Sequence, residues 1–284
     1  MPPDVMPPIV AQTVQPGEFR KIQSLTYQVA GIDLREGKEA LVGARLNKRM
    51  RELGLKDVSS YLSLVEADRT GLELIALIDA LTTNFTSFLR EPQHFEFLRS
   101  VILPALSTRA SIRVWSAGCS TGEEPYSILF HLAQALEERR LADISLLATD
   151  ISTRALSVAS SGIYPSERMK ELPEAWRKRF FQRGVGEQEG MVRVREEWRS
   201  RIQFRRLNLM EDFTAVPAAH VIFCRNVMIY FDKPTQQKLV QRFAERLEPG
   251  GWLLIGHSEG LMGMVHDLSY VMPAVYRKSS GRKN

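Results

Sequence analysis

A chain of 284 residues can bury one large core or two modest ones, and 44% hydrophobic with 25% charged residues is an ordinary globular composition. A formal charge of +5 is compatible with nucleic acid, an acidic protein partner or simple solubility, and the number alone favours solubility. Two cysteines form no disulfide framework, and the apolar stretch Leu72–Leu81 is interrupted by Glu73 and Asp79, so we expect a reducing cytoplasm and no membrane span.

The first 16 residues hold five prolines and few charges, without a basic segment followed by an apolar one. We expect residues 1–16 to form a disordered leader and not a signal peptide. From Gly17 to Leu89 apolar residues recur every three or four positions, and glycines fall where helices should end. This pattern predicts an all-α domain over residues 17–92, limited by Pro92. Its expected helices are Lys21–Ala30, Lys38–Leu53, Val58–Ala67 and Leu72–Thr83.

The pattern changes near Ile112, where short apolar runs begin to alternate with helical stretches. Such alternation predicts a parallel, doubly wound α/β sheet over residues 93–284. One insertion, at about residues 181–204, contains the alternating segment Met191–Arg195, which is typical of a half-exposed antiparallel hairpin. We expect this insertion to form a small β-subdomain. The expected buried strands are Ile112–Ala117, Ile144–Thr149, Ile202–Leu207, Val221–Cys224 and Trp252–Ile255.

The loop after the first expected strand, Trp115–Glu124, is rich in small residues. In an open α/β sheet ligands bind beyond the carboxyl ends of the strands, and residues such as Gly118 let the backbone approach them closely. Glu123 and Glu124 occupy the start of the next helix, where they suit a cationic group, such as the amino group of S-adenosylmethionine, better than a pyrophosphate. A tight turn with favourable helix-dipole charges explains these residues equally well.

Polar residues also follow the other expected strands. Asp150 ends the second strand, where an acidic residue commonly accepts hydrogen bonds from ribose hydroxyls; a cap for the next helix is the alternative. Asn208 and Leu209 follow the third strand and offer amide and backbone groups to an adenine. Arg225 and Asn226 follow the fourth strand. Together these residues predict a cofactor site along one edge of the sheet.

Four segments resemble the CheR family of chemotaxis receptor methyltransferases, and the resemblance runs from about residue 18 to residue 277. It implies a Rossmann-like S-adenosylmethionine methyltransferase sheet with a small antiparallel β-subdomain and an N-terminal all-α domain. It further implies methyl transfer from S-adenosylmethionine to glutamate side chains of a methyl-accepting chemotaxis receptor, with S-adenosylhomocysteine as the product. The segments are Asn84–Glu91 (NFTSFLRE), Trp115–Ser127 (WSAGCSTGEEPYS), Ala148–Ile151 (ATDI) and Phe223–Phe231 (FCRNVMIYF).

The resemblance also assigns roles to residues. Arg90 and Tyr230 match the two positions that the family places nearest the transferred methyl group. It implies a cytoplasmic monomer recruited to receptor arrays at the inner membrane, and in some members the β-subdomain binds the C-terminal tail peptide of the receptor. The implied cofactor residues, with Glu123 and Glu124 as alternatives for one contact, are Asn84, Thr86, Arg90, Gly118, Glu123, Glu124, Asp150, Asn208, Leu209, Arg225 and Asn226.

This chemistry fits the residues present. A glutamate with a pKa near ~4.3 is already ionised at neutral pH, so transfer to it needs no general base. Arg90 is expected to position that carboxylate by a charge-assisted hydrogen bond. Tyr230 is expected to wall the methyl channel, although a core aromatic is the alternative for it.

A basic stripe on the expected helix Lys38–Leu53 and the residues after it suggests a docking surface. Arg45, Lys48, Arg49 and Lys56 fall within an arc of about 100° on a helical wheel. Receptor methylation helices are rich in glutamate, so we expect these four residues to dock the receptor. A merely solvated helix face is the alternative.

Three other functions are weighed against this one. A nicotinamide dehydrogenase should show G-x-G-x-x-G after the first strand, where this chain has only Gly118 and Gly122. An RNA or DNA methyltransferase would explain the positive charge, but Asn226–Tyr230 lacks the prolines usual in base-modifying enzymes. A non-catalytic adaptor that binds receptor tails is the third. The five histidines show no ligand spacing, so we expect no metal, and we expect neither a nucleic-acid partner nor membrane insertion.

Overall fold

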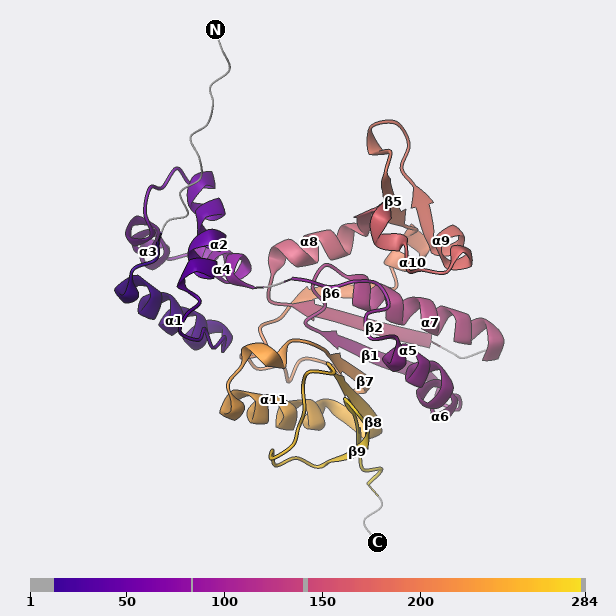
Figure 1. The fold of residues 1–284 in the computed structure, drawn as a ribbon. Coiled ribbons are helices and arrows are strands. Elements are labelled where there is room, and N and C mark those ends of the chain that lie inside the picture. Colours follow the sequence, from indigo (N-terminus) through magenta and orange to yellow (C-terminus); the bar gives the residue numbers. More distant parts are fainter. Residues whose placement is uncertain (1–12, 83, 140–142, 282–284) are drawn as a thin grey trace. The chain divides into compact units, whose positions relative to one another are not determined.

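The computed structural model describes residues 13–82, 84–139 and 143–281. By its internal contacts the chain divides into two compact units, one ending at residue 83 and one beginning at Asn84 (Figure 1). Within the described residues, no helix is long and apolar enough to cross a membrane.

The first unit is built, within residues 13–82, from the four helices α1 (Pro16–Ala30), α2 (Glu39–Glu52), α3 (Val58–Ala67) and α4 (Leu72–Leu81), which confirms the expected all-α domain. Local chemistry sets the helix ends: Gly31 takes the left-handed conformation after α1, with a φ of 68°, and the Asp57 side chain accepts from Ser60 N–H at 2.7 Å before α3. The core between the helices contains the fully buried side chains of Ile22, Leu46, Tyr61 and Leu77.

The end of the expected leader, residues 14–16, belongs to the folded helical unit. Val14 is only 2% exposed and packs in the core of the helical unit, and α1 begins at Pro16. Proline suits the first position of a helix, such as that of Pro16, because the N–H that proline lacks would have no hydrogen-bond partner there. The rest of the expected leader, residues 1–12, lies outside the described part of the chain.

The boundary between the units also differs from the expected one at Pro92. The segment Asn84–Glu91 belongs to the second unit, because Ser120 Oγ donates to the Asn84 carbonyl and Leu89 N–H donates to Ser127 Oγ, both at 3.0 Å. Helix α5 (Pro92–Phe97), the π-helical turn η1 (Leu98–Ile102) and α6 (Leu103–Ala105) then follow.

A mixed sheet forms the centre of the second unit. The strand order is β6-β2-β1-β7-β8-β10-β9 among the described residues. Neighbouring strands are parallel from β6 to β8, whereas β10 is antiparallel to both β8 and β9. The five expected strands are all present, and the two antiparallel strands at the C-terminal end were missed. The strands are β1 (Ser111–Ala117), β2 (Asp143–Asp150), β6 (Ile202–Arg206), β7 (Ala219–Cys224), β8 (Leu247–Ile255), β9 (Leu268–Met272) and β10 (Val275–Lys278).

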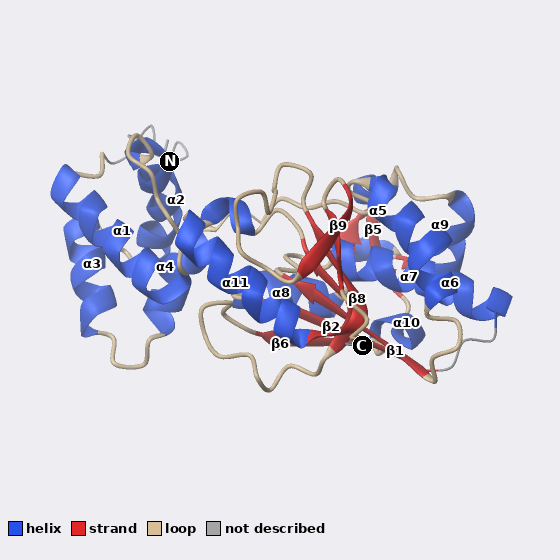
Figure 2. Cartoon of the chain, turned by 90° about the horizontal axis from the view of Figure 1, so that it is seen from below, coloured by secondary structure: helices blue, strands red, loops and turns tan. Residues whose placement is uncertain are grey.

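Each face of this sheet is covered by helices. Alternate side chains of β1 point to opposite faces, so Val114 packs in one apolar cluster and Trp115 in the other. The first cluster includes side chains from α7 (Glu123–Arg139) and α8 (Thr153–Ser161), and the second includes α11 (Lys233–Arg246). Figure 2 shows the strands, in red, enclosed between these helices. Because both faces are buried, a ligand must approach the sheet at the ends of its strands.

A small antiparallel sheet, with strand order β3-β5-β4, projects from the large sheet and its helices (Figure 1). The hairpin of β4 (Phe181–Arg183) and β5 (Met191–Val194) confirms the expected β-subdomain. The expected limits of about 181–204 need correction, because β3 (Ile163–Pro165) joins the small sheet and residues 202–204 belong to β6. The short helical segments of this region are η2 (Ser166–Met169), α9 (Glu174–Phe180), η3 (Gly186–Gln188) and α10 (Glu196–Arg199).

Candidate active site

The loop between β1 and α7 is shaped by glycines and held by the end of β2. Gly118 has a φ of 85°, and a Cβ there would lie 2.3 Å from Cγ2 of Val227, so only glycine fits. Ser120 N–H donates to Asp150 Oδ2 at 2.7 Å, and Ser152 N–H donates to Oδ1 at 2.9 Å. Asp150 is not the cap of α8, since the Ser152 side chain caps that helix. The buried Asp150 carboxylate therefore orients the loop where the sequence predicts a ribose site.

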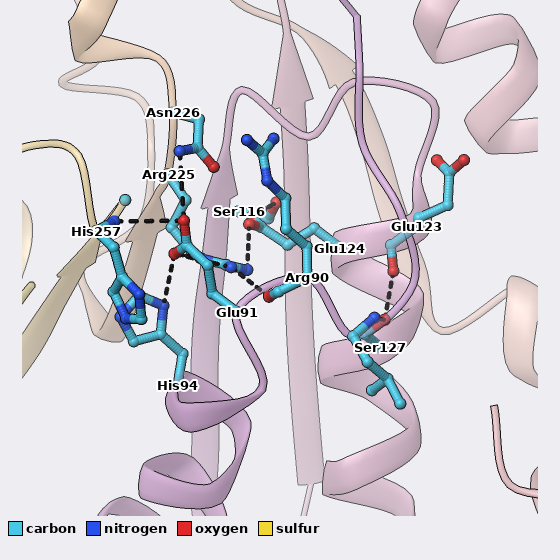
Figure 3. A network of polar contacts seen from close by, with 12 residues as sticks. Arg90, Glu91, His94, Ser116, Glu123, Glu124, Ser127, Arg225, Asn226 and His257 are labelled. Carbon is cyan, nitrogen blue, oxygen red and sulfur yellow. Dashed lines mark hydrogen bonds and ion pairs between the residues drawn. The ribbon is translucent and has the colours of Figure 1, made fainter. Parts of the chain in front are cut away.

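The two acidic residues at the start of α7 have different partners. Glu123 is fully buried, and its carboxylate accepts from Thr121 Oγ1 at 2.6 Å and pairs with Arg168 of η2. The Glu124 carboxylate accepts from Ser116 Oγ at 2.7 Å and pairs with Arg225 Nη1 at 3.1 Å (Figure 3). Burial raises the pKa of Glu124, although Arg225 opposes that effect. Glu123 is thus tied to the small-sheet region and Glu124 to the end of β7.

The segment that carries Arg90 has an unusual backbone. Leu89 and Glu91, its two neighbours, have φ angles of 56° and 55°, a left-handed conformation that costs a residue other than glycine about 1–2 kcal/mol. The Arg90 guanidinium donates to the Phe85 carbonyl at 3.1 Å and lies 5.8 Å from the centre of the exposed Phe85 ring. Within the described residues Arg90 forms no ion pair, so none of their carboxylates neutralises its charge.

Arg225 lies at the centre of the polar network in Figure 3. Its side chain is 2% exposed and pairs with two carboxylates, Glu91 Oε2 and Glu124 Oε2, each at 3.1 Å. Its Nη2 also donates to the Arg90 carbonyl. Burial raises the pKa of Glu91, but attraction to Arg225 and its hydrogen bonds outweigh burial and lower the pKa overall.

Asn226 follows Arg225 in a left-handed conformation with a φ of 59°. Its backbone N–H donates to Glu259 Oε2 at 2.9 Å, and its Nδ2 donates to Glu91 Oε1 at 3.4 Å. In the described part of the chain its Oδ1 is buried without a hydrogen-bond partner. A buried acceptor in that state fits a donor group of a ligand, such as an amino group.

The remaining predicted site residues lie at the same edge of the sheet. Leu207 N–H donates to the Asp150 carbonyl at 3.0 Å, which places Asn208 and Leu209 beside the end of β2. Both residues are buried, and Asn208 Oδ1 accepts from Met210 N–H. Thr86 is half-buried in the Asn84–Glu91 segment. Tyr230, in the turn η4 (Met228–Tyr230), is partly buried against the apolar cluster of α11.

Sequence reasoning missed several members of this network. Ser116 and Ser127 lie within a quoted motif but their side-chain roles were not assigned, and Glu91 ends the motif that contains Arg90. Glu259 accepts three backbone N–H groups, from Gly256, Asn226 and Ile229. The sequence offered one indication that Glu91 belongs to the site, namely its position directly after Arg90.

Two histidines that show no ligand spacing in the sequence meet at Glu91. One ligand atom from each of Glu91, His94 and His257 lies within 4.8 Å of the others. His94 is fully buried, and burial, with a smaller effect from Arg225, lowers its pKa to about 3, so it is neutral. Because Arg225 already pairs with the Glu91 carboxylate, a metal ion would have to compete with a guanidinium. We assign the cluster to the internal network.

The residues expected to dock the receptor lie on the other unit. Lys48 and Lys56 are exposed, whereas Arg45 and Arg49 are half-buried. The Arg45 guanidinium donates to the Leu81 carbonyl, and Arg49 donates from Nε and Nη2 to the Glu73 carboxylate at 2.9 and 2.6 Å. The two arginines are therefore engaged inside the helical unit.

Comparison with known families identifies both units. Residues 84–276 match the family described as CheR methyltransferase, SAM binding domain, and residues 17–82 match CheR methyltransferase, all-alpha domain. The second unit is therefore the S-adenosylmethionine-binding domain of a methyltransferase.

Relatives specify the class further. Chemotaxis protein methyltransferases from Klebsiella aerogenes and Salmonella typhimurium are 45% and 44% identical to this chain, covering 91% and 93% of it and 88% and 91% of their own lengths. The Escherichia coli protein of the same description is 46% identical over 85% of this chain and 83% of its own. The chain belongs to the CheR family of chemotaxis protein methyltransferases, and it methylates glutamate side chains of chemotaxis receptors with S-adenosylmethionine as methyl donor.

Proposed function

We propose that Arg90 positions the receptor glutamate while the ends of β1, β2, β6 and β7 hold the cofactor. The observation that carries this proposal is the difference between the two arginines of the site. Arg225 is buried and paired with two carboxylates, whereas Arg90 is half-buried and forms no ion pair in the described part of the chain. A substrate carboxylate is therefore attracted to Arg90.

S-adenosylmethionine, when bound, supplies a methyl group on a cationic sulfur. The residues that would hold it fit its chemistry. The Asp150 carboxylate is suited to the ribose hydroxyls, and Asn208 and Leu209 to the adenine. The unpartnered Asn226 Oδ1 and the buried Glu124 carboxylate are suited to the cationic amino group. Glu124 is preferred to Glu123, because Glu124 lies in the network at the ends of β1 and β7, whereas Glu123 is fully buried and tied to η2 through Arg168. Asn84, Thr86 and Gly118 complete the proposed pocket.

The protein does not need to remove a proton from its substrate. A glutamate carboxylate is ionised at neutral pH, so a carboxylate oxygen can attack the methyl carbon directly while the carbon–sulfur bond breaks. Arg90 then acts by aligning the oxygen, and Tyr230 by limiting the space beside the methyl group and excluding water. Alignment of this kind requires the Arg90 segment to be rigid.

Two surfaces are proposed to bind the receptor. On the helical unit, the exposed side chains of Lys48 on α2 and Lys56 in the loop after α2 attract the glutamate-rich methylation helices. Arg45 and Arg49 hold α2 in place within the unit. On the small sheet, the β4–β5 hairpin is proposed to bind a receptor tail peptide, which would recruit the protein to receptor arrays at the inner membrane. We propose that it acts there as a monomer, without nucleic acid.

The cofactor assignment is tested by calorimetric titration with S-adenosylhomocysteine. Asp150→Ala is expected to weaken binding about 10- to 100-fold, the loss of one or two hydrogen bonds to a charged group. Asp143→Ala makes the same change at the exposed, opposite end of β2 and should leave the affinity unchanged. Equal affinities for the two variants would contradict the proposed ribose site.

A further inference from the structure

The backbone on both sides of Arg90 has an unfavourable conformation, and contacts with neighbouring segments hold it in place. Leu89 and Glu91 both adopt left-handed conformations, at φ angles of 56° and 55°, and Asn226 opposite them does the same at 59°. Such conformations persist in residues other than glycine only where the surroundings over-determine them. Leu89 is held by the Ser127 hydroxyl. The contacts that hold the other side of Arg90 converge on the Glu91 carboxylate.

Glu91 receives hydrogen bonds from two separate parts of the second unit, Arg225–Asn226 after β7 and His257 after β8. Arg225 donates to its Oε2 from Nε at 3.3 Å and from Nη2 at 3.1 Å. Asn226 Nδ2 and the His257 N–H donate to its Oε1 at 3.4 and 3.3 Å. The side chain of Glu91 is 15% exposed, so these bonds form largely out of water. Glu91 thereby joins the Arg90 segment to the ends of β7 and β8.

Arg225 extends this connection to the proposed cofactor site. Its Nη2 donates to the Arg90 carbonyl, and its Nη1 donates to Glu124, which in turn accepts from Ser116 at the end of β1. All three guanidinium nitrogens thus have partners within the protein. In Figure 3 the side chain of Arg90 extends away from this junction, while its carbonyl is held by it.

We propose that Glu91 is a positioning residue for methyl transfer: through Arg225 and the Arg90 carbonyl, it fixes where the Arg90 guanidinium meets the receptor carboxylate. This inference rests on the proposed role of Arg90. Glu91 itself touches neither substrate nor cofactor in this scheme. Its carboxylate is needed because a neutral side chain would leave Arg225 with one carboxylate partner instead of two, and would loosen the grip on Arg90.

Loss of Glu91 should have different effects depending on whether Glu91 positions Arg90 or only stabilises the fold. If Glu91 only neutralised a buried charge, its loss would lower the stability of the protein but leave the turnover of the folded molecules unchanged. If it positions Arg90, turnover falls while the affinity for the cofactor product is kept. Because a misplacement of about 1 Å can cost on the order of 100-fold in rate, a loss of about 10- to 100-fold in kcat is expected for Glu91→Gln.

The experiment measures the full chain with receptor-containing membranes at saturating S-adenosylmethionine. The variants are Glu91→Gln, Glu91→Asp and Arg90→Ala, together with Glu91→Gln in the Arg90→Ala background. Glu96→Gln is the matched control, since Glu96 lies in the adjoining α5 and, among the described residues, its carboxylate forms an ion pair with the exposed Arg99 alone. For each variant, kcat, the receptor KM, the calorimetric affinity for S-adenosylhomocysteine and the thermal unfolding midpoint are determined.

We expect Glu91→Gln to lower kcat while the S-adenosylhomocysteine affinity changes by less than about threefold, Glu91→Asp to restore part of kcat, and Glu96→Gln to match the wild type. In the Arg90→Ala background the Glu91→Gln change should cost little more, because both act through one guanidinium. Multiplying losses in the double variant, or a Glu91→Gln kcat equal to the wild-type value, would overturn the inference. Full activity of Arg90→Ala would instead overturn the proposed function itself. If Glu91→Gln does not fold, Glu91→Asp alone and in the Arg90→Ala background gives the same comparison.

Discussion

Reversing the charge of Arg49 is expected to destabilise the helical unit, whereas reversing Lys48 is not, although both belong to the same basic stripe. Arg49 forms two hydrogen bonds with Glu73, and its guanidinium, despite the opposing effect of burial, lowers the pKa of that carboxyl. Glu73 is only 8% exposed, so the pair is largely shielded from water on its acidic side. Lys48 is exposed on the neighbouring position of α2.

The size of the effect follows from burial. Removing one partner of a buried ion pair costs about 3–5 kcal/mol. The Arg49 side chain is 31% exposed, so water screens part of the interaction, and loss of the pair should lower the free energy of unfolding by roughly 2–3 kcal/mol. Arg49→Glu also places a second carboxylate beside Glu73, so we expect it to lower this free energy by at least that amount. An exposed substitution such as Lys48→Glu should change it by no more than about 0.5 kcal/mol.

Urea unfolding of the full chain, followed by circular dichroism, tests the expected changes in the free energy of unfolding. Kinetics of receptor methylation test the docking role separately. Lys48→Glu and Lys56→Glu should each raise the receptor KM by about two- to fivefold at an unchanged unfolding midpoint. An Arg49→Glu variant with the wild-type midpoint would refute the argument from the Glu73 pair. An unchanged KM in both lysine variants would refute docking by Lys48 and Lys56.

Two further predictions concern the second unit. Burial lowers the pKa of His94 to about 3, so below pH 6.5 the unfolded chain binds a proton at this residue that the folded chain does not. The stability of the protein therefore falls as the pH drops from 7 to 5, and His94 contributes at most about 1.4 kcal/mol per pH unit to this fall. His94→Asn should show a shallower fall of the thermal midpoint, and an identical slope would contradict this. Gly118→Ala should weaken S-adenosylhomocysteine binding more than about tenfold, since its Cβ would meet Val227 at 2.3 Å. Gly37→Ala, at a similar φ of 82° in open space, should not weaken it, and equal effects would refute the steric argument.

The sequence predicts the elements of this fold where their apolar residues are periodic. The four helices and the five parallel strands have such patterns, because each buries a face or a whole strand. Strand β9 escaped prediction because its short hydrophobic stretch is broken by Ser269 and shows no regular alternation, and three of its five residues, Ser269 to Val271, are exposed. Strand β3 has only three residues, too few for any period.

The sequence motifs suggest a set of site residues, but they do not predict the network of contacts that the structure shows around them. The motifs contain Arg90, Asp150 and Arg225, yet nothing local pairs Glu91 with Arg225, which lies 134 residues further on. The same limit affects the basic stripe: a helical wheel orders the charges of α2, but it does not show that Arg49 faces Glu73 on α4. Contacts between distant segments depend on the packing of whole elements, which periodicity does not encode.

The contrast between the two arginines also bears on release of the product. Under the proposed roles, the charge of Arg225 is balanced by Glu91 and Glu124 at every stage of the reaction. Arg225 therefore makes the site rigid but does not change its affinity for the substrate or the product. Arg90 instead attracts a carboxylate that transfer converts into a neutral ester, and that attraction disappears with the reaction. Tight binding of the anionic glutamate would stabilise the ground state and slow transfer. On this proposal a half-buried Arg90, screened by water and already bonded to the Phe85 carbonyl, would bind the carboxylate only moderately, which would favour both turnover and release.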